Sequence, residues 1–170
     1  LHKLADKKVG VIGTGATAIQ SVPYVGEHAK ELFVFQRTPS SVDLRGNSPT
    51  DPQWSETLGP GWQRERRENF NDVLLGKPVK EDLVNDGWTE IFRHLMSVED
   101  KSLSPEEMGE MAEIADFKKM NGIRQRVEST VTDAEAADAL KPWYRQFCKR
   151  PTFNDEFLPT FNRENVTLVD

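Results

Sequence analysis

The segment Val9-Gly-Val-Ile-Gly-Thr-Gly-Ala-Thr-Ala-Ile-Gln20 decides the fold of this chain. It starts with an apolar run that predicts a buried strand, and the glycines that follow predict a tight turn into a helix. In such a unit Gly13 permits the turn, Gly15 lets the backbone approach a pyrophosphate, and Ala18 keeps the helix close to the strand. The unpaired N–H groups and the positive dipole end of the helix attract the anion. The segment therefore predicts a dinucleotide site built from Gly13, Thr14, Gly15, Ala16, Thr17, Ala18 and Gln20.

A second predicted strand, Leu32–Phe35, ends just before Arg37 and Thr38. The end of this strand distinguishes the two nicotinamide cofactors, because a carboxylate there binds the ribose diol whereas an arginine neutralises a 2′-phosphate. Arg37 offers a planar set of donors that binds phosphate oxygens in pairs, and Thr38 adds a hydroxyl. The pattern predicts NADP(H) and not NAD(H).

Each of these features also has a simpler explanation. Glycine-rich turns of similar sequence occur in loops that bind nothing, and a lone arginine such as Arg37 is most often a solvated surface residue. Here a strand precedes the turn, an amphipathic stretch follows it, and a second strand completes one βαβ crossover. We therefore favour a dinucleotide site over a turn that serves only packing.

The composition sets the outer bounds of the interpretation. The chain has 170 residues, 36% hydrophobic content and a net charge of −6. These values suit one ordinary globular core of mixed class, and the acidic balance argues against nucleic acid or an anionic membrane as a partner. Cys148 is the single cysteine, no apolar run reaches membrane-spanning length, and the histidines lack ligand spacing. We expect a soluble, cytoplasmic protein without a metal site.

The chain is expected to fall into three parts. Residues 1–40 predict the first part of a Rossmann-like NADP-binding domain, 41–140 a helix-rich insertion, and 141–170 a return segment that ends in a strand over Asn165–Asp170. The fold class is thus α/β with an incomplete parallel sheet, since a doubly wound sheet needs more strands than the pattern supports. The chain starts without an initiator methionine, and we expect an excised piece of a longer protein.

The predicted insertion begins with turns and continues with helices. Residues 40–60 are rich in proline and glycine and predict turns, and helices are expected over Gly61–Phe70 and Trp88–Met96. Ser104-Pro-Glu-Glu107 is a capping box with proline at the first helical position. Thr132–Glu135 is expected to cap a last helix. The apolar rhythm after the capping box predicts a long or once-broken helix whose buried stripe is Met108, Met111, Ala115, Met120, Ile123, Val127 and Val131.

The segment Lys141–Asp155 combines aromatic residues with Cys148 and the adjacent cations Lys149 and Arg150. Irregular segments of this kind often carry a site, although a charged surface turn explains the pattern equally well. If the backbone is extended, the two cationic side chains point to opposite sides and can serve different ligands. The cations would activate the Cys148 thiol, but no histidine is placed as its base, so a buried or half-buried structural cysteine is favoured.

Four stretches of the sequence carry a resemblance to a known family. They are Gly13–Gln20, Phe35–Pro39, Ala115–Asn121 and Lys141–Asp170, the last with Cys148-Lys-Arg-Pro151 and Phe161-Asn-Arg-Glu-Asn-Val166. On these residues the chain resembles the NADPH-binding domain and helical insertion of Baeyer–Villiger monooxygenases. The resemblance spans nearly the whole chain but covers only part of such an enzyme.

The resemblance implies a flavin-dependent oxygenase that uses NADPH to reduce FAD and inserts one oxygen atom of O₂ beside a ketone carbonyl, which gives an ester or a lactone. Arg37 and Thr38 match the residues that read the 2′-phosphate, and Lys149 matches a further phosphate-binding lysine. Arg150 matches the catalytic arginine held near the flavin peroxide and the nicotinamide. The family's FAD-binding glycine motif is absent from this sequence, so the expected partner is an FAD domain of the same polypeptide, and the isolated chain is not expected to catalyse oxygenation.

Two alternatives stay open. An N-hydroxylating or flavin-containing monooxygenase shares the second glycine-rich turn, although the long helical insertion and Cys148-Lys-Arg150 argue against it. A non-enzymatic NADP(H)-sensing module, in which cofactor occupancy shifts a helical subdomain, belongs to a different class. Formation of only N-oxides or hydroxylamines by the full-length protein would favour the first alternative. The absence of a flavin-binding turn upstream of Leu1 would favour the second.

Overall fold

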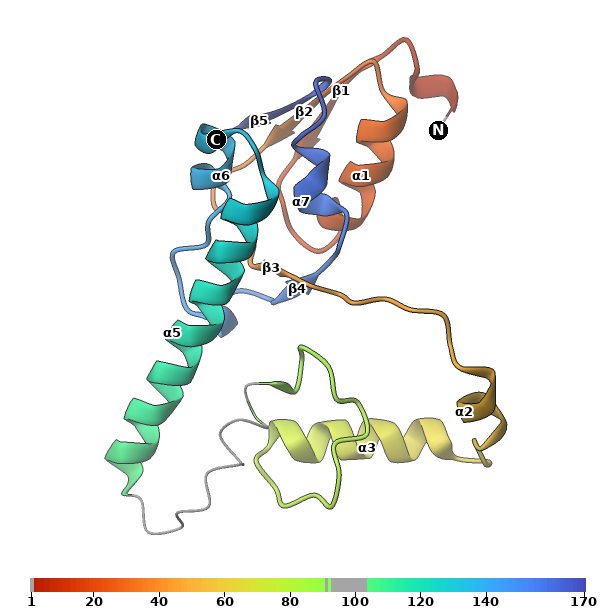
Figure 1. Ribbon diagram of the computed structural model, residues 1–170, viewed down its shortest axis with the longest axis vertical. Coiled ribbons are helices and arrows are strands. Elements are labelled where there is room, and N and C mark those ends of the chain that lie inside the picture. The colour runs from red at the N-terminus through yellow and green to blue at the C-terminus, as the bar shows by residue number, and fades with distance from the viewer. Residues whose placement is uncertain (1, 91, 93–103) are drawn as a thin grey trace. The chain divides into compact units, whose positions relative to one another are not determined.

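The computed structural model describes residues 2–90, 92 and 104–170 (Figure 1). It divides the chain into two compact units: unit 1 contains Leu1–Gly46 and Phe117–Asp170, and unit 2 contains Asn47–Asp116. Unit 2 is shorter than the insertion expected over 41–140, because the second half of a long helix packs with the sheet-bearing unit. The functional domain boundaries given above stay a prediction.

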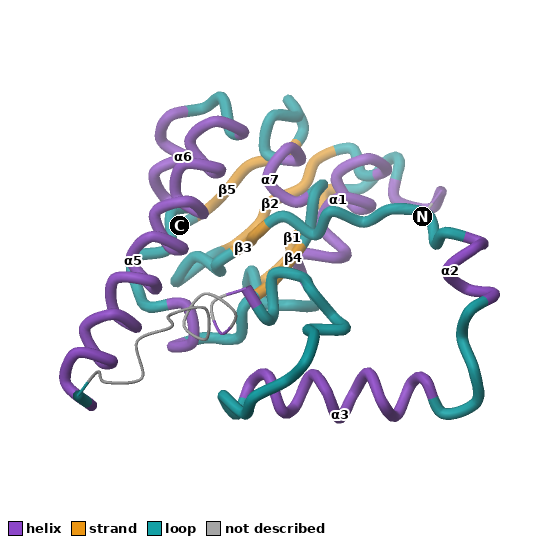
Figure 2. The backbone as a smooth tube through the Cα atoms, turned by 60° about the horizontal axis from the view of Figure 1, so that its bottom comes forward, coloured by secondary structure: helices purple, strands orange, loops and turns teal. Residues whose placement is uncertain are grey.

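Unit 1 contains a three-stranded, fully parallel sheet in the order β1-β2-β5, which Figure 2 shows in orange. Its strands are β1 (Lys8–Ile12), β2 (Glu31–Phe35) and β5 (Val166–Val169). In the central strand, Leu32 and Val34 are fully buried, whereas Glu31, Phe33 and Phe35, which alternate with them, are partly or fully exposed, so one face of the sheet supports the core. The expected α/β fold with an incomplete parallel sheet is confirmed, and the strands lie where the apolar runs predict them.

Two helices cover that face of the sheet: α1 (Ala18–His28), which leaves the glycine turn, and α7 (Phe157–Thr160), which precedes β5 (Figure 1). They approach closely at Gly26. A Cβ atom at this position would lie 2.9 Å from Thr160 Cγ2 and 3.1 Å from Val166 Cγ2. The missing side chain therefore lets α1 pack against α7 and β5 at the same point.

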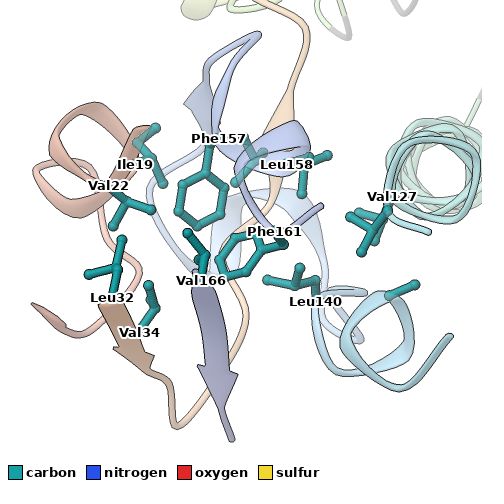
Figure 3. Packing of buried hydrophobic residues seen from close by; sticks show 13 residues of the cluster. Ile19, Val22, Leu32, Val34, Val127, Leu140, Phe157, Leu158, Phe161 and Val166 are labelled. Atoms are coloured by element: carbon teal, nitrogen blue, oxygen red, sulfur yellow. The ribbon is translucent and has the colours of Figure 1, made fainter. Parts of the chain in front are cut away.

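One cluster of buried apolar side chains joins the sheet, α1, α7 and the helices that return from the insertion (Figure 3). The cluster includes Ile19, Val22, Leu32, Val34, Val42, Val127, Val131, Ala137, Leu140, Phe157, Leu158, Phe161 and Val166. The rings of Phe157 and Phe161 meet edge to face, with centroids 5.1 Å apart. This core holds α1, which follows the glycine turn, against the sheet.

The longest helix confirms its predicted start. In α5 (Pro105–Thr130) the Ser104 N–H donates to Glu107 Oε2 over 2.7 Å, and the Glu107 N–H donates to Ser104 Oγ over 3.2 Å. The helix is unbroken, and its predicted stripe is buried from Ala115 onward, at Ala115, Met120, Ile123, Val127 and Val131. The prediction is wrong for Met108, which is 60% exposed, because the helix starts in unit 2 and its first turns lie outside the core cluster.

The other predicted helices are partly confirmed. Helix α3 (Trp62–Leu74) and helix α6 (Ala134–Ala139) lie where expected, and Asp133 Oδ1 caps α6 by accepting from the Ala136 N–H over 2.8 Å. The helix expected over Trp88–Met96 lies mostly outside the described residues. The stretch 40–60 was predicted to contain only turns. This is wrong, since the stretch includes a short strand and the short helix α2 (Pro52–Glu56), whose N-cap residue is Asp51.

That strand, β3 (Val42–Asp43), pairs in parallel with β4 (Thr152–Phe153) and forms a two-stranded sheet. Helix α5 holds this pair through Arg126, whose Nη1 donates to Val42 O over 2.8 Å and whose Nη2 donates to Asn154 O over 3.0 Å. The ion pair between Lys119 and Asp43, 2.5 Å long, adds a second attachment. The segments that follow β2 and precede β5 are thereby joined.

Candidate functional site

The turn after β1 has the geometry that the glycine pattern predicts. Gly13 has a φ of +94°, a conformation that only glycine adopts easily, and its N–H donates to Phe35 O over 2.7 Å. A Cβ atom at Gly13 or Gly15 would meet nothing within 4 Å, so open space lies in front of the turn. Thr17 at the N-cap of α1 makes no capping hydrogen bond with its side chain. The Ile19 N–H donates to Gly15 O over 3.0 Å and the Gln20 N–H donates to Thr17 O over 3.2 Å, so a ligand at this helix end would bind the backbone N–H groups ahead of Ile19. The backbone here fits a bound pyrophosphate.

The loop after β2 is attached directly to this turn. The hydroxyl of the buried Thr14 donates to Thr38 O over 3.4 Å, and Ser40 Oγ donates to Thr14 O over 2.5 Å. These two bonds hold the backbone around Arg37 beside the glycine turn. The side chain of Arg37 is exposed, and none of the ion pairs within the described residues includes it.

The return segment is brought to the same place by the β3–β4 pair. Thr152 donates to Ser41 O twice, from its backbone N over 3.1 Å and from Oγ1 over 2.7 Å. Lys149 and Arg150, just before this attachment, are both exposed, and Lys149 has extended backbone angles (φ −131°, ψ 166°). Segments that are more than a hundred residues apart in the sequence therefore share one site.

A pocket of about 550 Å³ opens where these segments meet. Among the described residues, its lining carries three cations, Arg37, Lys149 and Arg150, and no carboxylate. A second pocket of unit 1, about 730 Å³ at the end of β5 and beside α6, has the opposite character, since Asp133, Glu135, Asp138 and Asp170 line it. The cationic lining of the first pocket favours an anion such as a phosphate, and the acidic lining of the second disfavours one.

Most of the predicted site residues line this cationic pocket. They are Gly13, Thr14, Gly15, Ala16, Arg37, Thr38, Lys149 and Arg150. Thr17 and Gln20 instead border a separate hollow with Tyr24, and Gln20 Nε2 donates to Ala16 O over 2.7 Å. Ala18 packs against the core cluster, because the helix rotates it toward the sheet. The part of these residues in cofactor binding stays a prediction.

Three further polar residues of the pocket were not predicted: Gln36, Ser40 and Thr152. Gln36 is buried, and its Nε2 donates to Ala139 O and to Asp170 Oδ1, each over 2.9 Å. It therefore anchors the end of β2 to α6 and to the end of β5. No sequence signal marks these residues, because their partners lie in distant segments.

The expectation of a buried or half-buried Cys148 is wrong, since this thiol is free and exposed. The single 3₁₀ turn Gln146–Cys148 places Gln146 inside, 1% exposed, and turns Cys148 outward. Among the described residues no group of three or more His, Cys, Asp or Glu side chains has the arrangement of a metal site. No helix in the same part of the chain is long and apolar enough to cross a membrane.

Several known proteins are similar to this chain in sequence and in structure. No protein-family model matches the chain. A Baeyer-Villiger monooxygenase of Stachybotrys chlorohalonatus is 60% identical over 100% of this chain and 28% of its own length. The structure of a polycyclic ketone monooxygenase from Thermothelomyces thermophila matches with a TM-score of 0.83 and 44% identity, over 100% of this chain and 29% of that protein. The structure of a steroid monooxygenase bound to NADP matches with a TM-score of 0.68 and 26% identity, over 98% of this chain and 33% of that protein.

The parallel sheet, the glycine turn and the crossover helix together define a partial Rossmann-like α/β protein. Within that class, the chain corresponds in sequence and fold to part of the Baeyer–Villiger monooxygenases. It spans less than a third of the length of the curated relative that it matches at 60% identity.

Proposed function

We propose that the cationic pocket binds NADP(H). The glycine turn and the N-cap of α1 offer backbone N–H groups to the pyrophosphate, and Arg37, Thr38 and Lys149 offer donors to the 2′-phosphate. The observation that carries this proposal is the convergence of three cations on a pocket beside the glycine turn that no carboxylate of the described part of the chain lines. The steroid monooxygenase bound to NADP, which shares the fold, supports it.

The full-length protein, in this proposal, is an NADPH- and FAD-dependent monooxygenase that inserts one oxygen atom of O₂ next to a ketone carbonyl and gives an ester or a lactone. The names of the relatives support this reaction class, and their greater length supports a further, FAD-binding domain in the same polypeptide. A cytoplasmic location completes the proposal, because the single cysteine is a free thiol that suits a reducing compartment.

Arg150 is the residue of this chain that would act in the reaction. NADPH and FAD, when bound to the full-length protein, would supply the hydride and the activation of O₂. The Arg150 guanidinium lines the pocket, so it can bind the nicotinamide end of the cofactor. It can also stabilise the negative charge that develops on the carbonyl oxygen of the ketone during oxygen insertion.

The cofactor preference tests this proposal. We expect the full-length protein to bind NADPH more tightly than NADH, and we expect Arg37→Ala to weaken NADPH about 10- to 100-fold while NADH changes little, because only NADPH has the additional phosphate. Isothermal titration calorimetry with both cofactors measures the two dissociation constants.

The matched control is Arg163→Ala, which removes an exposed arginine that does not line the cationic pocket. This variant should bind both cofactors as the parent protein does. Equal losses for NADPH and NADH in Arg37→Ala would refute the role assigned to Arg37.

A further inference from the structure

One side chain, Tyr144, contacts both of the segments that bring cations to the pocket. Its hydroxyl donates to Pro39 O over 2.7 Å and accepts from the Ser41 N–H over 3.0 Å. The Lys149 Nζ lies 5.1 Å from the centroid of its ring. Tyr144 therefore joins the loop after Arg37 to the ammonium group of Lys149.

The hydroxyl end of Tyr144 acts on the backbone. Pro39 is buried and Ser41 is 1% exposed, so the Ser41 N–H would have no water to replace the tyrosine oxygen. Burial also raises the pKa of Tyr144, and the hydroxyl keeps the proton that it donates to Pro39 O. This end of the side chain fixes the path of the loop that begins at Arg37.

The ring of Tyr144 contacts the end of a long side chain, that of Lys149. A lysine has many rotamers, and to hold its ammonium group at one place costs conformational entropy unless a contact restricts it. The aromatic face supplies that contact through its negative electrostatic potential. Trp143 meets the Tyr144 ring edge to face, with centroids 5.8 Å apart, so the ring itself is supported.

We propose that Tyr144 is a positioning residue for the phosphate-binding end of the pocket: its ring orients Lys149, and its hydroxyl orients the loop that carries Arg37. The inference rests on the proposed function, because the phosphate in question is the 2′-phosphate of NADP(H). The two ends of the side chain make separable contributions to cofactor preference.

Two substitutions separate these contributions. Tyr144→Phe removes the hydroxyl and retains the ring, and Tyr144→Leu removes both. Calorimetry of the full-length protein with NADP⁺ and NAD⁺ should show that Tyr144→Phe weakens NADP⁺ about fivefold, which corresponds to one lost hydrogen bond. Tyr144→Leu should weaken NADP⁺ by a further two- to fivefold, which corresponds to the lost contact between ring and cation. Binding of NAD⁺ should stay within about twofold in both variants.

A double-mutant cycle with Lys149→Met tests whether the ring acts through Lys149. In the Lys149→Met background, Tyr144→Phe and Tyr144→Leu should bind NADP⁺ equally well. Tyr24→Leu, a change at the other, exposed tyrosine of the chain, is the matched control and should change neither cofactor.

The outcomes are distinct. A parent protein without a preference for NADP⁺ would contradict the proposed function itself. A normal preference in both Tyr144 variants, an equal loss of NADP⁺ and NAD⁺, or a Phe-to-Leu difference that persists without Lys149 would contradict only the role of Tyr144. If Tyr144→Leu does not fold, the NADP⁺ and NAD⁺ constants of Tyr144→Phe still decide whether the hydroxyl contributes.

Discussion

Arg150 and Arg37 border the same pocket but are assigned different tasks, and single substitutions can separate them. Arg37 would bind the phosphate and thus set the affinity for NADPH, whereas Arg150 would stabilise charge during the reaction. A residue that acts in the transition state lowers kcat when it is removed, and a residue that only binds changes KM.

We therefore predict that Arg150→Ala in the full-length enzyme lowers ester or lactone formation at least about a hundredfold, while NADPH binding is partly retained. Product formation from a cyclic ketone, measured beside the calorimetric affinity for NADPH, checks both statements. Ester formation at a nearly normal rate would remove Arg150 from the mechanism.

The sequence predicts the local features of the site. Gly13, Arg37 and Thr38 follow strand ends at fixed spacing, so their arrangement in one βαβ unit could be derived before the structure was known. The contacts of Thr152 with Ser41 could not be predicted, since they join segments that are distant in the sequence. The outward position of Cys148 depends on a single 3₁₀ turn that leaves no pattern.

At the scale of elements, the contact between α1 and α7 depends on the absence of a side chain at Gly26. We predict that Gly26→Ala destabilises the protein by about 1–3 kcal/mol, because the added methyl group would overlap Thr160 and Val166 in a packed region. The matched control is Gly122→Ala in α5, where an added Cβ meets nothing within 4 Å. There the higher helix propensity of alanine should stabilise the protein by about 0.5–1 kcal/mol.

Chemical denaturation of the two variants measures both free energies of unfolding, and the opposite signs make the comparison independent of the general effect of a glycine-to-alanine change. Equal effects at the two positions would mean that the close approach of α1 to α7 and β5 does not limit this packing.

The capping box of α5 makes the stability of the first turn of this helix depend on pH. Two hydrogen bonds with Ser104 hold the pKa of Glu107 below its usual value of 4.5, and the bond from the Ser104 backbone N–H contributes most. Because the pKa is lower in the folded state, the cap stabilises the helix above the unfolded-state pKa, and this contribution is lost as the pH falls through the folded-state pKa. We predict faster amide hydrogen exchange in the first turn of α5 on acidification from about pH 5 to about pH 3, after correction for intrinsic rates.

In Glu107→Gln this extra acid sensitivity should disappear, because the amide does not titrate in that range and still accepts from the Ser104 N–H. Glu110→Gln, a change at an exposed glutamate of the same helix, should behave like the parent protein. An unchanged acid sensitivity in Glu107→Gln would show that the carboxylate does not govern the end of the helix.

Elements with strong local signals could be predicted, and those without them could not. The capping residues and the apolar periodicity predict α5 and α6, and the apolar runs predict the strands of the sheet. Met108 continues the same rhythm but is exposed, since periodicity alone does not say where a packing partner ends. The pair β3–β4 is too short to show an alternating pattern.

For the whole molecule, the distribution of charge matters more than its sum. The chain has a net charge of −6, yet three cations line the pocket at the glycine turn and four carboxylates line the pocket beside α6. A ligand with several phosphates is thereby directed to one end of the sheet. The composition shows only the net charge, whereas the fold places positive and negative side chains at different pockets.

The account depends on the claim that the 2′-phosphate of NADP(H) is bound between Arg37 and Lys149 beside the glycine turn. A crystal structure of the full-length protein with NADP⁺ bound tests this claim most directly. We predict that the phosphate oxygens lie within hydrogen-bond distance, about 3 Å, of the Arg37 guanidinium and that the pyrophosphate faces the N-terminus of α1. A 2′-phosphate directed into solvent with Arg37 turned away, or a cofactor bound elsewhere on the chain, would contradict it.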